Sequence, residues 1–458
     1  MARKRMGDIG FRRAALIGSL QLTLSLDSCS VLGRRQLIVF SEDSRLILRD
    51  SCPSNETPDP LRAFVQPPCI CPARRIFWGH HVQVHEGTLV KRRTFLQLSS
   101  AALIGMGNSS PEPAYRVVSA YKPSPQPGMP GPFPGQVVSV RSAKCIDEVK
   151  DEINVAVVRE MMDRGMQQLT GESSVLRAWR RFISPTDSVG IKVNCVGRPR
   201  VVSSPEVVAE IVRNLTEVGV KSSQICIYDR FAERLYEMNY GANLPKGVQI
   251  HGAEFTRGSI RNYDPATYVE VDFFGEDDTR SEMIAMISKF TKIINIPNMK
   301  DHGAAGVTGC LKNIAYGSFS NMDRSHRFRQ THTYSFVGRL AAVEPVRSRT
   351  VLQIMDGLRG VWHGGPSALN PRFVFYPKQM MFGTDPVAID RLMLDVIEAK
   401  RRAEGVVSLW DRTVPEGKDR NDPNVSVYIR EPGHIEFAST LGLGVSDLTK
   451  IKVKEIEV

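Results

Sequence analysis

The chain has 458 residues, of which 42% are hydrophobic and 24% are charged, so it is long enough for one large or two medium hydrophobic cores. The formal net charge of +11 is spread along the sequence without a long basic run or a nucleic-acid motif, which argues against a nucleic-acid partner. No apolar run reaches the roughly 18 residues that a bilayer-spanning helix needs, so no transmembrane span is expected.

Residues 1–90 lack the pattern of a folded domain. They contain eleven arginines but a single lysine, and half of the eight cysteines. No sustained strand or helix periodicity follows residue 27 or so. A translation start assigned too early would produce such a segment, and we therefore predict Val90 as the true first residue.

A basic cluster followed by a short apolar run occupies residues 91–107. The sequence KRRTFLQ at 91–97 and the apolar stretch after it resemble a twin-arginine export signal. We therefore expect the twin-arginine translocase as a partner and a periplasmic or otherwise extracytoplasmic location. A competing hypothesis uses residues 3–26, which are basic and then apolar like a secretory signal. Neither candidate is followed by a small-x-small motif, so the cleavage site stays open.

Residues 108–134 contain eight prolines, which favour extended polyproline geometry and exclude a helix. We interpret this stretch as a linker, and we expect one α/β domain over residues 135–458. Strand-like and helix-like segments alternate there, as is typical of a largely parallel or mixed sheet with helices on both faces in Rossmann-like layers. The predicted strands are 137–140, 188–194, 224–229, 248–251, 268–273, 292–296, 351–355 and 379–382. The predicted helices are 154–170, 205–218 with an N-cap at Ser204, and a helix that Asp385 opens.

Residues 295–313 form the densest polar segment of the chain. A strand ends near residue 296, and a glycine-rich turn is then predicted to open a helix. Ligands of open α/β sheets lie at the carboxyl ends of strands, and helix N-termini favour anions. We therefore predict a pocket for a phosphate, a carboxylate or a metal-bound anion, formed by Lys300, His302, Thr308 and Lys312. The alternative is that the glycines serve close packing while the lysines are solvated.

Other strands also end in polar residues, which suggests a shared cleft. Lys192 and Asn194 close one predicted strand, and Asp229 closes the next. Asp356 and Asp385 each follow a strand-like run. The alternatives are an ordinary turn at Asp356 and a helix N-cap at Asp385.

Histidines near this cleft are candidate metal ligands. We predict His302 and His326 as ligands of a divalent metal, with His332 and His363 as further members of the set. For each histidine, the alternative is an ordinary hydrogen-bonded or surface role. The cysteines beyond residue 90 contain no CxxC pair, so no iron-sulfur cluster is expected. Motifs of serine hydrolases, zincins and dinucleotide-binding proteins are absent.

Four sequence blocks resemble the domain-of-unknown-function family 362, over about residues 136–400. The blocks are 191–194, 204–207, 297–313 and 355–366 with 385–390. This family has no settled activity, and relatives often carry a cysteine-rich ferredoxin-like module that this chain lacks. The resemblance implies a real site at Lys300, His302, Thr308, Lys312 and Asn313 but implies no substrate.

The sequence thus predicts an exported enzyme that acts on an anionic small molecule, with a divalent metal as an optional cofactor. Lys300 and Lys312 would neutralise anionic oxygens, His302 would be a metal ligand or general acid-base, and Asp356 would complete the catalytic set. The ligand-binding residues would be Lys192, Asn194, Thr308, Lys312, Asn313 and Asp385. The alternatives are a non-catalytic extracytoplasmic ligand-binding protein and a purely structural or interaction role.

Overall fold

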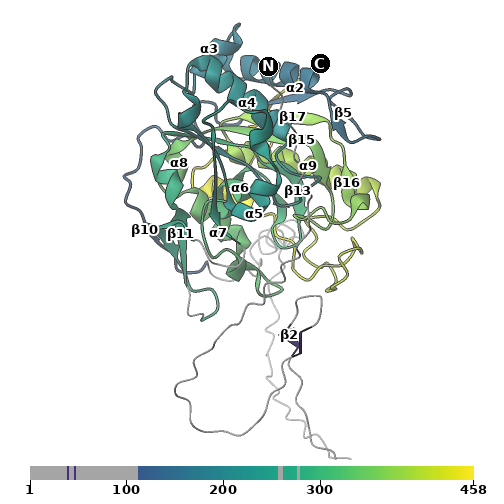
Figure 1. The fold of residues 1–458 in the computed structure, drawn as a ribbon. Helices are drawn as coiled ribbons and strands as arrows, with labels where there is room; N and C mark the ends of the chain where they lie inside the picture. The colour runs from purple at the N-terminus through teal and green to yellow at the C-terminus, as the bar shows by residue number, and fades with distance from the viewer. Residues whose placement is uncertain (1–38, 41–45, 48–111, 256–260, 276–278) are drawn as a thin grey trace, which may run out of the picture. The chain divides into compact units, whose positions relative to one another are not determined.

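The computed structural model describes residues 39–40, 46–47, 112–255, 261–275 and 279–458 (Figure 1). The chain divides into two units, Met1–Phe95 and Leu96–Val458. In the first unit, β1 (Val39–Phe40) pairs with β2 (Leu46–Ile47) in antiparallel orientation. The predicted export signal at 91–107 lies outside the described residues.

A mixed sheet forms the centre of the second unit and has eleven strands among the described residues. Its middle is parallel and buried on both faces, as expected for strands rich in Val and Ile. The continuous strand order is β18 (Lys452–Glu457), β4 (Gln136–Arg141), β17 (Gln379–Gly383), β15 (Thr350–Val361), β12 (Lys292–Asn295), β7 (Val189–Lys192), β8 (Ile225–Phe231) and β9 (Gln249–Glu254). Three more strands extend it: β13 (Asn298–His302), β14 (Gly306–Thr308) and β16 (Val374–Phe375). Antiparallel β17 sits between β15 and β4, so the sheet is mixed.

Two buried clusters cover the two faces of this sheet, and each contains its own set of helices. One face carries α2 (Val155–Thr170), α3 (Val175–Arg180) and α4 (Pro205–Val218). The other carries α6 (Cys310–Tyr316), α7 (Thr333–Ala341), α9 (Pro386–Ala403) and α10 (His434–Thr440). Short helices α5 (Ala232–Glu237) and α8 (Val346–Arg349) complete the set in the described part of the chain. The predicted α/β fold with helices on both faces is confirmed.

Helix ends follow the sequence signals closely. Asn154 caps α2 through Val157 N, and Asp385 caps α9 through Ala388 N. Gly219 ends α4 with a φ of 106°, a left-handed conformation that glycine adopts without strain. Ser204 stands at the start of α4 as predicted, but its side chain forms no capping hydrogen bond.

The segment predicted as a proline-rich linker packs on the folded body from residue 112 onward. It contributes β3 (Arg116–Val118), which pairs with β10 (Tyr263–Glu270) beside β11 (Arg280–Ile284) in a three-stranded sheet. Further along, Gly128 and Met129 donate backbone hydrogen bonds to the carbonyls of Ser348 and Arg347. Proline excluded a helix here but left an extended strand possible, so the folded body begins before Gln136.

The glycine-rich stretch after β12 differs from the predicted turn because it forms a buried hairpin. Strand β13 pairs with β14 in antiparallel orientation and with β15 in parallel orientation. Helix α6 begins only after this hairpin, at Cys310. As a result, the polar side chains of β13 and β14 are buried in the protein interior.

The four cysteines of the described body, Cys145, Cys195, Cys226 and Cys310, are buried free thiols. None of the described helices combines the length and apolar character needed to cross a bilayer.

Candidate functional site

A cleft of about 750 Å³ lies where the parallel strands β7 and β8 end. Lys192 and Asn194 enter it from the end of β7, and Asp229 enters from β8. The β13–β14 hairpin and α6 form another side. The segments 363–367 and 417–430 close the far wall. Polar residues at the ends of neighbouring parallel strands thus meet at one edge of the sheet.

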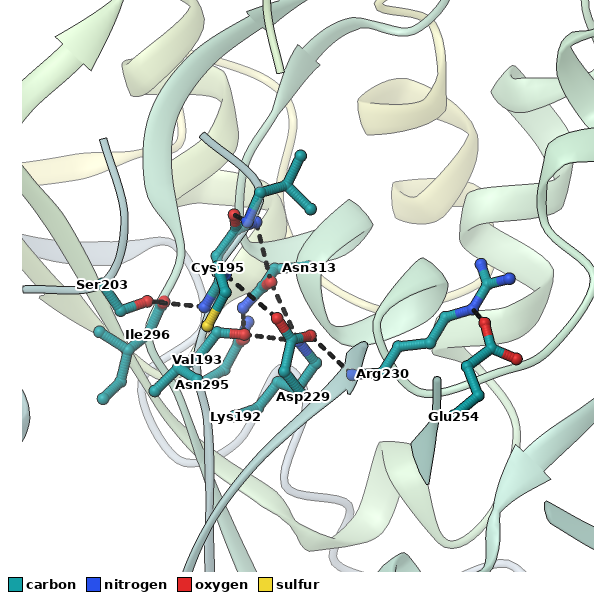
Figure 2. A network of polar contacts seen from close by, with 12 residues as sticks. Lys192, Val193, Cys195, Ser203, Asp229, Arg230, Glu254, Asn295, Ile296 and Asn313 are labelled. Atoms are coloured by element: carbon teal, nitrogen blue, oxygen red, sulfur yellow. Dashed lines mark hydrogen bonds and ion pairs between the residues drawn. The ribbon is translucent and has the colours of Figure 1, made fainter. Parts of the chain in front are cut away.

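Lys192 is the centre of a buried polar network at the cleft floor (Figure 2). Its Nζ donates to Val193 O at 2.6 Å, to Asp229 Oδ1 at 2.8 Å and to Asn313 Oδ1 at 3.3 Å. Asp229 also accepts hydrogen bonds from the backbone N–H groups of Cys195 and Arg230. The ammonium and the carboxylate are both fully partnered, so this ion pair is part of the framework.

Asn313 extends the network to neighbouring strands. Its Oδ1 accepts from Asn194 Nδ2 at 3.2 Å, and its Nδ2 donates to Asn295 Oδ1 at 2.8 Å. Asn295 in turn donates to Gln353 Oε1 at 2.7 Å. These amides connect α6 to β12 and β15, which fixes the position of α6 against the sheet.

Lys300 lies on β13 behind the cleft surface and is fully buried. Its Nζ donates to Asn194 Oδ1 at 2.9 Å and to Val196 O. Burial lowers the pKa of Lys300 to about 7, against the opposing influence of Cys195 and Asp229. Lys300 thus lies behind the cleft without lining it, and its amine is already held by two oxygen atoms.

Lys312 differs from the other two buried lysines because its amine faces the cleft without a hydrogen bond or ion pair among the described residues. The side chain is 8% exposed, and Nζ lies 4.4 Å from the centre of the Tyr316 ring. Burial lowers the pKa of Lys312 to about 7, while Asp323 acts in the opposite direction. Near neutral pH, the group is therefore present as both ammonium and free amine.

His302 and His326 lie beside Lys312, with their ring centres 5.2 Å apart. His302 Nδ1 accepts hydrogen bonds from the N–H groups of Ala304 and Ala305, both at 3.1 Å, so its proton is assigned to Nε2. Burial and the charge of Lys312 hold the pKa of His302 far below its ordinary value. Burial likewise lowers the pKa of His326 to about 3. Both rings are therefore neutral at pH 7.

Four polar atoms of cleft-lining residues lack a hydrogen-bond partner among the described residues. They are Thr308 Oγ1, His326 Nε2, His363 Nδ1 and Arg430 Nε. Buried polar groups are normally partnered, so orphaned atoms around one cavity indicate groups available to a ligand. His363 Nε2 lies 3.1 Å from Arg420 O, and burial lowers the pKa of this ring to about 4.

Asp356 and Asp385 were predicted to complete the site, but neither lines the cleft. Asp356 accepts from the backbone N–H groups of Ser204 and Leu358. Asp385 accepts from the N–H groups of Gly135, Val445 and Ala388. Their carboxylates therefore fix loops and a helix start, which are the alternatives that the sequence left open.

The amino end of α6, predicted to bind an external anion, is occupied by a carboxyl group of the protein itself. Asp390 on α9 accepts from Cys310 N at 2.6 Å and from Leu311 N at 2.9 Å. A Cβ on Gly309 would lie 2.1 Å from Asp390 Oδ1, so glycine is required for this approach. This contact joins residues 80 positions apart in the sequence, and no local pattern indicated it.

The far wall of the cleft was not predicted from the sequence, and segment 411–423 forms part of it. Lys418, Asp419 and Arg420 of this segment line the cavity. Buried Arg401 holds the segment by donating to Val407 O, Pro423 O and Trp362 O. Composition alone gave no signal for this, since the loop is polar and its anchor lies on α9.

The described residues contain no group of three or more His, Cys, Asp or Glu side chains placed to hold a metal ion. His302 and His326 offer at most a pair of imidazoles. His302 Nδ1 is engaged by two backbone N–H groups, which leaves only Nε2 for coordination. A metal would therefore need most of its ligands from a bound molecule or from water.

The fold and site together define an α/β protein with a basic, partly unsatisfied cleft at the carboxyl ends of its parallel strands. Residues 189–395 match the profile of the family described as Domain of unknown function (DUF362). The match includes the strand ends, the β13–β14 hairpin, α6 and most of α9. The resemblance stated from the sequence is thus confirmed. No curated protein matches the chain.

Proposed function

We propose that this protein binds an anionic small molecule in the cleft and acts on it as an enzyme. The observation that carries the proposal is Lys312, a buried amine that faces the cleft with no hydrogen-bond or ion-pair partner among the described residues. Burying a cationic group without a partner destabilises a fold, so such a group is expected where a ligand supplies the partner.

The charge of the lining supports an anionic ligand. Eight lysines and arginines line the cleft, against four aspartates and no glutamate. Two of the cations, Lys192 and Arg230, are neutralised by Asp229 and Glu254. The remaining surplus still favours an anion, and a recessed cleft strengthens that attraction.

The neutral donors fit the same ligand. Thr308 Oγ1 and the Nε2–H of His302 can donate hydrogen bonds to carboxylate or phosphate oxygens. Lys312, titrating near neutral pH, can give or take a proton at the ligand. This combination supports general acid-base chemistry and is the reason for preferring an enzyme over a passive binder.

Calorimetric titration with inorganic phosphate and with mono- and dicarboxylates tests the proposal. We expect binding to wild-type protein, and we expect Lys312→Met to weaken it about 10- to 100-fold because one charged contact is lost. Binding should also weaken as the pH rises above about 7, where Lys312 loses its charge. Lys450→Met, on an exposed lysine outside the cleft, is the matched control. Equal affinity in wild type and Lys312→Met would contradict the proposal.

The rival function is a non-catalytic extracytoplasmic binding protein. Compounds that bind are incubated with the protein and followed by NMR, since a binder leaves them unchanged and an enzyme converts them.

Measuring binding with and without added divalent metal tests the optional cofactor, because the pair His302 and His326 could complete a ligand-bound ion. If added metal strengthens ligand binding to wild type but not to His326→Ala, then His302 and His326 are identified as its ligands.

Export by the twin-arginine route belongs to the same proposal and rests on residues 91–107. Replacing both Arg92 and Arg93 by lysine should retain the protein in the cytoplasm. Fractionation of cells that express the two versions measures this. Equal distribution of wild type and variant would contradict the assignment.

A further inference from the structure

Three buried lysines in and behind the cleft differ in whether other atoms of the protein hold their amino groups. Lys192 is held by a carboxylate and two further oxygens. Lys300 is held by an amide oxygen and a carbonyl, and it does not line the cleft. Lys312 lines the cleft and has neither kind of partner among the described residues. A nucleophilic amine must be neutral, reachable and free of acceptors, and Lys312 meets these conditions.

We propose that Lys312 is a nucleophile that forms a Schiff base with the carbonyl group of a small oxo acid, such as a 2-oxo carboxylate. This rests on the proposed function, since the cleft must first bind the anionic part of the substrate. It narrows that function to a class of substrate and to a covalent step.

The surroundings of Lys312 suit this step. Its Nζ lies against the Tyr316 ring, which shields one side from water, and the cleft opens on the other side. His302 is a neutral ring with its proton on Nε2, so it can donate a hydrogen bond to the carbonyl oxygen. The Thr308 hydroxyl, which has no partner among the described residues, can donate a hydrogen bond to the carboxylate of the same molecule. These donors activate the carbonyl and hold its charged end.

The step balances without an oxidant or reductant. The lone pair of Lys312 Nζ attacks the carbonyl carbon, a C–N bond forms, and the oxygen takes up a proton to give a carbinolamine. The carbinolamine loses its oxygen as water, which carries away both protons of the original amine, and a C=N bond remains. His302 Nε2–H assists the departure of the oxygen by hydrogen bonding.

The acidity of the group agrees with this role. With a pKa of about 7, a substantial fraction of Lys312 is free amine at neutral pH. An ordinary exposed lysine has about a thousandfold smaller free-amine fraction at that pH. Buried lysines with a lowered pKa are the usual source of Schiff-base amines in proteins.

Reductive trapping tests the proposal. Full-length protein is incubated with glyoxylate and cyanoborohydride at pH 7, digested, and mapped for carboxymethyl-lysine by mass spectrometry. We expect the adduct at Lys312 in large excess over Lys418, an exposed lysine of the same cleft. Lys312→Arg should lose the adduct but keep anion binding, since arginine retains the charge. Lys450→Arg, at an exposed lysine outside the cleft, should label at Lys312 as wild type does.

Calorimetry with glycolate, which has a hydroxyl group in place of the aldehyde of glyoxylate, distinguishes failure of the Schiff-base proposal from failure of the proposed function. Glycolate binding without any adduct at Lys312 would overturn the Schiff base and leave the proposed function standing. No binding of either acid and no adduct would overturn both. Equal labelling of Lys312 and Lys418 would show an unselective reaction and would also overturn the proposal.

Discussion

The cleft has a floor, formed by Lys192, Asp229 and Asn313, and a side, which carries Lys312 and Thr308. Both are buried and polar, but they differ in whether their polar groups have hydrogen-bond partners. On the floor, Lys192 and Asp229 have partners on every charged atom, and Asn313 uses both ends of its amide. On the side, Lys312 and Thr308 Oγ1 have none among the described residues. A partnered buried charge stabilises position, whereas an unpartnered one destabilises the fold and is available to a ligand. Residue type alone therefore does not separate framework from function.

The largest expected effect comes from breaking the floor. Asp229→Ala leaves the buried Lys192 ammonium without its counter-charge and removes the acceptor of two backbone N–H groups. We expect a loss of about 3–5 kcal/mol in the free energy of unfolding, measured by chemical denaturation. The double variant with Lys192→Met should recover part of that loss, because the unpaired charge is then gone.

The control for this prediction is Asp447→Ala, which breaks an exposed pair with Lys450. Exposed ion pairs contribute less than about 1 kcal/mol. Similar losses in Asp229→Ala and Asp447→Ala would show that the floor is not a stabilising framework.

The next effect comes from crowding the floor without removing any polar atom. A Cβ on Gly317 would lie 2.3 Å from both Cε and Nζ of Lys192. Gly317→Ala should therefore displace Lys192 from its acceptors and lower the free energy of unfolding by roughly 1–3 kcal/mol. Gly303→Ala is the control, because its nearest neighbour would be 3.7 Å away. A similar loss in thermal and chemical unfolding of the two variants would contradict the contact.

The fold was largely predictable because its central strands and helices carry strong local signals. Val and Ile runs gave β7, β8 and β12. Helical spacing from residue 154 gave α2, and the cap at Asp385 gave the start of α9. The β13–β14 hairpin was not predictable, since its glycines and polar residues also fit a simple turn. Strand β3 was hidden by prolines that exclude a helix but permit an edge strand.

The site was predictable only in part, for a different reason. The strand-end rule selected Lys192, Asn194 and Lys312, which do lie at one cleft. It also selected Asp356 and Asp385, whose carboxylates serve backbone N–H groups elsewhere. Which polar residue finds a partner depends on contacts between segments far apart in the sequence, and local pattern carries no information about those contacts.

A smaller effect should appear as a pH dependence at the start of α6. Burial raises the pKa of Asp390 to about 7, whereas an unfolded aspartate has a pKa of about 4. Between these values the folded state binds more protons, so this group lowers folding stability as the pH rises. Asp390→Asn cannot ionise, and its stability relative to wild type should improve by roughly 2 kcal/mol from pH 4 to 6. Urea titrations across this range measure the difference, and a constant difference would contradict the assignment.

The smallest expected effect is a gain in folding stability, and it comes from a substitution on the side of the cleft. Lys312→Met removes an unpartnered buried amine, so we expect the free energy of unfolding to rise by about 1–2 kcal/mol below pH 7. The folded pKa is about 7 and the unfolded pKa about 10.4, so between them the unfolded state binds more protons. Wild-type stability therefore recovers as the pH rises, and the advantage of the variant should shrink toward pH 10.

Denaturation of Lys312→Met at pH 6 and pH 9.5 measures this, and Lys192→Met is the contrast. Lys192 is fully partnered, so its removal strands the Asp229 carboxylate and should destabilise the protein. Two buried lysines on adjoining surfaces of one cleft would then respond to the same substitution with opposite signs. If both variants lost stability, Lys312 would belong to the framework, and the separation between a satisfied floor and an available side would fail.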